Sequence, residues 1–329
     1  MTRLMLPHWT RRATLGGLAA GAGAGLAGFG WDSAAAEPPP ETRRIRIIQD
    51  EGIPVLCWAP QYLAVEFLRM EGFEEIELIS FEATNNAISL VNDSADFAVP
   101  LATDIAIEAD KGGEITLLSG LHVGCVEVFA SERVKSITDL RGARLAADGV
   151  ESDARRFLSA VVAYVGLDPE RDVEWVYGHA RTWAEAFADG EVDVVRAFPP
   201  MTYDLHELGF GHVIMNTTLD DPWRNFYCCM IAAQSDFVRR YPVATKRALR
   251  AYAKAQQACA NDRERSARLL VELGATERLD YARRVVDEVP YGAWREYDPA
   301  ASLRFFALRL REAGFIKESP GALVDRVAD

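Results

Sequence analysis

The sequence lacks the motifs that mark the most familiar enzymes. It has no HExxH, GxSxG or phosphate-loop pattern, and its five histidines are scattered along the chain. Its five cysteines include no CxxC pair, and an odd number of cysteines does not suggest a disulfide framework. We therefore predict no catalytic residue, no metal site and no cofactor.

Positive charge is also in short supply. The 329 residues include 36 Lys and Arg against 49 Asp and Glu, which gives a formal net charge of −13. A strongly acidic chain stays soluble and repels the phosphates of DNA and RNA. We expect no nucleic-acid partner.

A long block of Leu, Val and Ile is absent near the N-terminus. The run Leu15 to Gly30 is short and rich in glycine; it follows Arg11-Arg12 and precedes Ala34-Ala35-Ala36. This pattern is typical of a twin-arginine signal peptide over residues 1–36, whereas a transmembrane anchor needs a longer apolar block. Residues 37–43 then form a linker. We expect a periplasmic protein that loses its signal peptide and does not insert into the membrane.

Strand and helix patterns alternate through the first part of the mature chain. Short apolar strands at Arg44 to Gln49, Ile76 to Phe81 and Asp96 to Val99 are separated by segments with helical spacing. Such βαβα repeats predict a mostly parallel sheet with helices on its faces. The same rhythm restarts in the second third of the chain, and helices dominate after Gln234.

Two apolar segments are predicted to link two lobes. Leu118 to Ala130 reads as strand, glycine kink and strand, and Phe226 to Ala233 is the return. We predict an α/β fold with lobe I over residues 44–125 and 230–329, lobe II over residues 126–229, two crossover strands and a helical C-terminal tail. The ligand site is then expected in the cleft between the lobes.

Five short segments together carry a family signature. They are Gln61–Glu66 (QYLAVE), Asn92–Ala98 (NDSADFA), Ser136–Gly142 (SITDLRG), Ala188–Asp193 (ADGEVD) and Phe237–Pro242 (FVRRYP). In this order and spacing they resemble the substrate-binding proteins of ABC importers for nitrate, sulfonate, taurine and pyrimidine precursors. The resemblance covers the chain from about Arg44 to its end, and it implies a two-lobed type II periplasmic binding protein.

This resemblance implies a monomeric receptor that closes by a hinge on a small ligand and docks on an inner-membrane ABC permease. The chain departs from the family in two places. Phe198-Pro199-Pro200 stands where relatives often have Trp-Glu-Pro, and Val65 and Glu66 replace the usual lysine-containing stretch. These departures leave the fold unaffected but leave the ligand class open.

Candidate ligand contacts follow from the fold class. In an open α/β lobe, ligands lie beyond the carboxyl ends of strands, where helix N-termini offer unpaired N–H groups. Polar residues of such loops, and ring side chains near the cleft, are therefore candidates: Trp58, Thr84, Asn85, Thr103, His122, Ser152, Phe198, Trp223 and Tyr227. Helix capping by Thr84 or Ser152 and core packing of the aromatics are the alternatives.

The charge near Ser152 bears on the ligand class. Glu151 and Asp153 flank it and would repel a bare oxyanion, although Arg181 and Arg196 could reverse that effect. We therefore favour a planar aromatic or heterocyclic, pyrimidine-like ligand stacked on aromatic rings. A receptor for nitrate, sulfonate or taurine-like anions is the alternative.

The pair Cys228-Cys229 raises the possibility of an enzyme or of a metal or redox site. Yeast-type pyrimidine-precursor synthases resemble the chain here and carry a Cys-Cys-Cys-Phe-Cys run. They also need a lysine for pyridoxal phosphate and a reactive histidine, and the matching positions hold Pro100 and Asp104. No histidine accompanies the cysteines at ligand spacing, so zinc is not predicted. We interpret the pair as two small residues on a buried strand. An extracytoplasmic sensor remains a third reading.

Overall fold

We describe a computed structural model of the chain, which covers residues 37–49, 55–80, 86–178 and 182–328. The predicted signal peptide lies outside these residues. One compact unit extends from Pro39 to Asp329 and contains both sheets described below. Among the described residues, no helix is long and apolar enough to cross a membrane.

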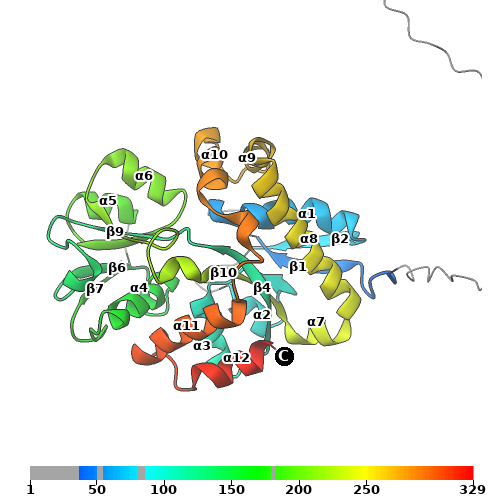
Figure 1. Cartoon of the computed structure of the whole chain (residues 1–329), viewed down its shortest axis with the longest axis horizontal. Helices are drawn as coiled ribbons and strands as arrows, with labels where there is room; N and C mark the ends of the chain where they lie inside the picture. Colours follow the sequence, from blue (N-terminus) through cyan, green and yellow to red (C-terminus); the bar gives the residue numbers. More distant parts are fainter. Residues whose placement is uncertain (1–36, 50–54, 81–85, 179–181, 329) are drawn as a thin grey trace, which may run out of the picture. The chain divides into compact units, whose positions relative to one another are not determined.

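The first sheet has five strands in the order β2-β1-β3-β10-β4 (Figure 1). The strands are β1 (Arg44–Ile48), β2 (Glu75–Ile79), β3 (Phe97–Ala98), β4 (Ile115–Val123) and β10 (Tyr227–Gln234). The first three pair in parallel, and β10 runs antiparallel to β3 and β4. The isoleucines of β1 are fully buried because helices cover the sheet on both faces.

The second sheet repeats this plan in the order β7-β6-β8-β5-β9. Its strands are β5 (Glu127–Ala130), β6 (Arg144–Ala147), β7 (Glu174–Tyr177), β8 (Val194–Ala197) and β9 (His212–Asn216). Again three strands are parallel, and β5 lies antiparallel between β8 and β9. The predicted α/β class and restarted βαβα rhythm are confirmed.

Helices fill the connections and form the C-terminal part of the chain. The α-helices are α1 (Ala59–Met70), α2 (Ile88–Val91), α3 (Ala102–Asp110), α4 (Asp153–Tyr164), α5 (Trp183–Ala188), α6 (Met201–Leu208), α7 (Ser235–Arg240), α8 (Pro242–Asn261), α9 (Arg263–Glu272), α10 (Leu279–Glu288), α11 (Pro299–Glu312) and α12 (Pro320–Ala328). Short 3₁₀ turns are η1 (Leu56–Trp58), η2 (Ile137–Asp139), η3 (Trp223–Asn225) and η4 (Tyr291–Ala293). Helix α8 packs on α1, and α11 packs on α3 and α4, so the predicted helical tail covers the first sheet.

Two connections join the sheets, and they are hydrogen-bonded to each other. The first runs through Gly124 and Cys125 between β4 and β5, and the second passes through Thr217 and Thr218 between β9 and β10. The Thr218 hydroxyl accepts a hydrogen bond from the Cys125 amide at 3.1 Å, and the Thr217 hydroxyl accepts one from the Val126 amide at 3.0 Å. The two connections therefore form one paired hinge segment.

The backbone of the first connection is unusual. Gly124 and Cys125 both have positive φ, of 76° and 81°. A side chain at Gly124 would collide with Thr218, since an added Cβ would lie 2.2 Å from its Oγ1. A left-handed conformation costs a non-glycine residue about 1–2 kcal/mol, so the packing around Cys125 must hold it there.

The second connection ends earlier than the sequence indicated. The sequence predicts lobe II up to residue 229 and a return to lobe I at residue 230. In the structure the whole of β10, from Tyr227, belongs to the first sheet. The difference arises because the apolar run from Phe226 looks the same on either side of a crossing, and only the pairing of β10 with β3 and β4 decides its place.

Candidate ligand-binding site

A pocket of about 380 Å³ lies between the two sheets, at the carboxyl ends of their parallel strands. The first sheet contributes Cys57 and Trp58 after β1 and Val99 after β3. The second contributes Asp148 after β6 and Phe198 after β8. Its size is typical of sites for small organic molecules, and its place matches the predicted cleft.

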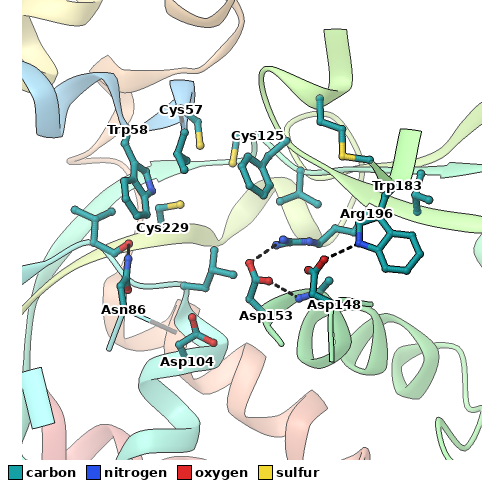
Figure 2. A pocket seen from close by; sticks show the side chains of 18 of the residues that line it. Cys57, Trp58, Asn86, Asp104, Cys125, Asp148, Asp153, Trp183, Arg196 and Cys229 are labelled. Carbon is teal, nitrogen blue, oxygen red and sulfur yellow. Dashed lines mark hydrogen bonds and ion pairs between the residues drawn. The ribbon is translucent and has the colours of Figure 1, made fainter. Parts of the chain in front are cut away.

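The pocket wall is mainly apolar, and its polar groups pair with one another. The Arg196 guanidinium donates to the Asp153 carboxylate at 2.7 Å, and the Trp183 indole N–H donates to Asp148 at 2.7 Å (Figure 2). The Asn86 amide donates to the Val99 carbonyl at 3.0 Å. These contacts hold the polar side chains in fixed orientations around the apolar space.

Asp104 is a carboxyl group of the pocket wall whose pKa is shifted. It is almost fully buried on α3, and Arg156 of α4 donates to it at 2.9 Å. Burial raises the pKa of Asp104 to about 7; the Arg156 charge opposes this rise and the nearby Asp153 adds to it. The Arg156–Asp104 contact joins α3, which follows β3 of the first sheet, to α4, which follows β6 of the second sheet.

The described residues that line the pocket include more acidic groups than basic ones. Among the described residues that line it, three carry carboxyl groups, Asp104, Asp148 and Asp153, and one is a cation, Arg196. That arginine is already neutralised by Asp153. Asp104 is likewise paired with Arg156, so a bare oxyanion would find both of these arginines engaged and would meet the Asp148 carboxylate, whereas a neutral or cationic ligand would not be repelled.

Some of the candidate residues predicted from the sequence line this pocket, and others lie near it. Trp58 and Phe198 line it. Ser152 is buried beside it as the N-cap of α4, and its hydroxyl accepts from the Arg155 amide at 3.2 Å. Thr103 is buried in the first turn of α3, next to Asp104. Thr84 and Asn85 lie outside the described residues.

Two other candidates lie in the core. Trp223 is 2% exposed and packs among the aromatic rings of α4 and α11. Tyr227 is fully buried, and its hydroxyl donates to the Trp294 carbonyl at 2.5 Å. Neither is among the described residues that line the pocket. Both residues fit the alternative given in the sequence analysis, which is that these aromatic side chains pack in the core.

His122 lies in a cluster that sequence reasoning missed. It stands on β4 directly opposite Cys229 of β10, at a β-bulge in this strand pair. Cys57 of η1 and Cys125 of the hinge segment complete the cluster, whose ligand atoms all lie within 4.8 Å of one another. Spacing along the chain gave no hint of it, because four separate segments supply the four residues.

The three clustered cysteines also line the pocket. Figure 2 shows the Cys57 and Cys125 sulfurs turned toward each other, with Cys229 beside Trp58. Hydrogen bonding to Cys125 lowers the pKa of both Cys57 and Cys229. All five cysteines of the chain are buried and free of disulfides.

The two sheets, the paired hinge and the pocket between them define the two-lobed periplasmic-binding-protein fold, as predicted. The chain belongs to the NMT1/THI5 like family, whose model matches residues 62–266. No curated protein matches the sequence.

Solved structures share this fold at low sequence identity. The periplasmic nitrate-binding protein NrtA from Synechocystis PCC 6803 has a TM-score of 0.70 and 15% identity, covering 88% of this chain and 87% of its own. The periplasmic aliphatic sulphonate binding protein SsuA from Escherichia coli has a TM-score of 0.65 and 16% identity, covering 88% and 92%. The Candida albicans CA3427 gene product, described as having the generic periplasmic binding protein fold, has a TM-score of 0.68 and 13% identity, covering 87% and 96%.

Proposed function

We propose that the chain is a periplasmic solute receptor of an ABC importer, which closes about its hinge on a small ligand. The observation that carries this proposal is the pocket lined from both sheets, next to two hydrogen-bonded crossings. A ligand that touches both lobes favours the closed arrangement, and the closed form is the one expected to dock on the permease. The fold shared with nitrate- and sulphonate-binding periplasmic proteins supports it.

The proposed ligand is a planar aromatic or heterocyclic molecule, pyrimidine-like in size, and neutral or cationic. Trp58 and Phe198 offer apolar ring surfaces from opposite lobes. Asp104 and Asp148 offer carboxylate acceptors for ring N–H or amino groups. Both kinds of contact suit a flat molecule with polar edges.

A nitrate, sulfonate or taurine-like anion is the alternative, because two proteins that share the fold are a nitrate-binding and an aliphatic sulphonate binding protein. Within this pocket an anion would have to compete with Asp153 for Arg196, since these two groups are 2.7 Å apart. It would also approach Asp104 and Asp148. The charge balance therefore favours the heterocycle.

An enzyme of the pyridoxal-phosphate type is the alternative from another class. Such an enzyme holds its cofactor through a lysine amine. The chain has five lysines, and none belongs to the described pocket lining: Lys111, Lys135, Lys246, Lys254 and Lys317. Asp104, at the position matched to the enzyme histidine, is instead engaged by Arg156. These observations support a binding protein, as opposed to a synthase.

Native mass spectrometry of residues 37–329 tests the proposal. We expect a small bound mass that is lost on unfolding, or a rise of the unfolding midpoint with pyrimidines or aromatic amines in a ligand screen. The Phe198→Ala variant should weaken binding at least tenfold, whereas Phe210→Ala, at an exposed ring outside the pocket, should not. A response to nitrate or sulfonate alone would refute the ligand class, and a pyridoxal phosphate adduct would refute the receptor.

Uptake separates an importer from an extracytoplasmic sensor. Deletion of the gene should abolish import of the identified ligand into cells, and the Phe198→Ala variant should restore import only at high ligand concentration. Normal import with loss of a transcriptional response to the ligand would instead identify a sensor.

A further inference from the structure

The cluster of three cysteines and His122 has the composition of a metal site. Its members come from η1, β4, the hinge segment and β10, so the fold alone brings them together. All four side chains are at least nine-tenths buried: Cys57, His122, Cys125 and Cys229. We propose that these four residues bind one zinc ion at the pocket wall, independently of the ligand proposed above.

The distances allow tetrahedral coordination. Zinc–sulfur bonds of about 2.3 Å at tetrahedral angles place two sulfurs about 3.8 Å apart, and zinc–nitrogen bonds are shorter. The four ligand atoms here lie within 4.8 Å of one another. Side-chain shifts of about 1 Å or less would therefore close the site. Three thiolates and one imidazole are a recurrent structural zinc set, and tetrahedral sulfur–nitrogen coordination is typical of zinc.

The histidine is oriented as a ligand would be. Its Nδ1 lies 3.3 Å from the Val123 carbonyl, while its Nε2 is buried and makes no hydrogen bond to any described residue. A metal-bound histidine commonly donates its other ring N–H to a backbone carbonyl, which fixes the tautomer and the ring plane. An imidazole nitrogen buried without a partner is costly, and a metal ion would satisfy it.

Neighbouring groups hold the ligands in place. The Tyr291 hydroxyl donates to the Cys57 carbonyl at 3.0 Å, and the Tyr291 ring meets His122 edge-on at 5.7 Å. The Gln256 amide donates to the Gly120 and Leu121 carbonyls, just before His122 on β4. Such supporting contacts are what a preorganised metal site requires.

A zinc ion here would stabilise the hinge. Cys125 is a non-glycine hinge residue with positive φ, and bonding its sulfur to an ion shared with β4 and β10 would fix that conformation. Four protein ligands complete the coordination, as in structural zinc sites. A disulfide between two of the cysteines would leave the third thiol and the His122 Nε2 without partners.

Cobalt(II) is the probe for this site, because it replaces zinc and absorbs light. Residues 37–329 are purified under reducing conditions, stripped of metal and titrated with cobalt. We expect sulfur-to-cobalt charge-transfer bands and tetrahedral visible bands that saturate at one equivalent and disappear when zinc is added. The Cys57→Ser and Cys229→Ser variants should bind cobalt at least tenfold more weakly, whereas Cys259→Ser, at a buried cysteine of α8, should bind normally.

A second measurement on the unaltered chain covers the case in which the variants fail to fold. One equivalent of zinc should raise its unfolding midpoint by several degrees, and a chelator should reverse the rise. Absence of thiolate–cobalt bands, unchanged cobalt binding in both ligand variants, or loss of binding in Cys259→Ser would overturn the proposal.

Discussion

Replacing Trp223 distinguishes a core residue from a ligand contact. The sequence made it a candidate for the binding site, while the structure buries it to 2% exposure among Phe157, Tyr164, Phe305 and Phe306. We expect Trp223→Ala to lose stability and to keep the ligand affinity of the folded fraction. The cause is the cavity that the missing indole leaves between α4 and α11.

The size of the effect follows from the burial. Truncating a fully buried Trp or Phe to Ala costs about 3–5 kcal/mol of the free energy of unfolding. For the roughly 290 residues from Pro39 to Asp329, an unfolding entropy of about 0.6 kcal/mol/K converts this into a midpoint about 5–8 °C lower. The indole N–H makes no hydrogen bond to a described residue, so Trp223→Phe should cost much less.

Differential scanning calorimetry measures the midpoint, and ligand titration below the transition measures affinity. Trp183→Ala is the matched control, because Trp183 lines the pocket and is only half-buried. That control should weaken ligand binding with a smaller loss of stability. The reasoning would be refuted if Trp223→Ala abolished binding while its midpoint fell by less than about 2 °C.

Further predictions concern pH and strand packing. Because burial raises the pKa of Asp104 to about 7 from its ordinary 3.8, the native state holds this proton more tightly than the unfolded chain. The bound proton therefore contributes to the free energy of unfolding below about pH 4, and this contribution is lost as the pH rises through 7. In Asp104→Asn, the free energy of unfolding measured with urea should fall less over this pH range. An unchanged fall in the variant would contradict this account. Gly120→Ala should reduce soluble yield or the unfolding midpoint, because its Cβ would lie 2.2 Å from the Tyr227 ring, whereas Gly149→Ala meets no atom within 4 Å. Equal stability of the two glycine variants would argue against this packing of β4 on β10.

Local sequence patterns carried most of the fold prediction. Apolar runs with strand character preceded segments of helical spacing, and a parallel pair of strands needs a crossover helix, so βαβα patterns specify parallel sheets. Helix capping depends on local sequence in the same way: capping was the alternative to a ligand contact for Ser152, and its hydroxyl accepts from the α4 backbone. Such features depend on residues a few positions apart.

The candidate site was only partly predictable. Trp58 and Phe198 could be found because each follows a strand, and strand ends face the cleft by topology. The position of Trp223 could not be found in this way, since a cleft-side aromatic and a core aromatic have the same local sequence. Its neighbours Phe305 and Phe306 are distant in the chain.

The sequence by itself determined the α/β class, the two-lobed plan and the acidic character of the chain, because these follow from local periodicity and composition. Only the tertiary structure decided which strand belongs to which sheet and which charges face the pocket. It alone placed His122 opposite Cys229 and brought Cys57 and Cys125 beside them. The physical reason is that these contacts join segments far apart in the chain, and strand pairing and packing set their distances.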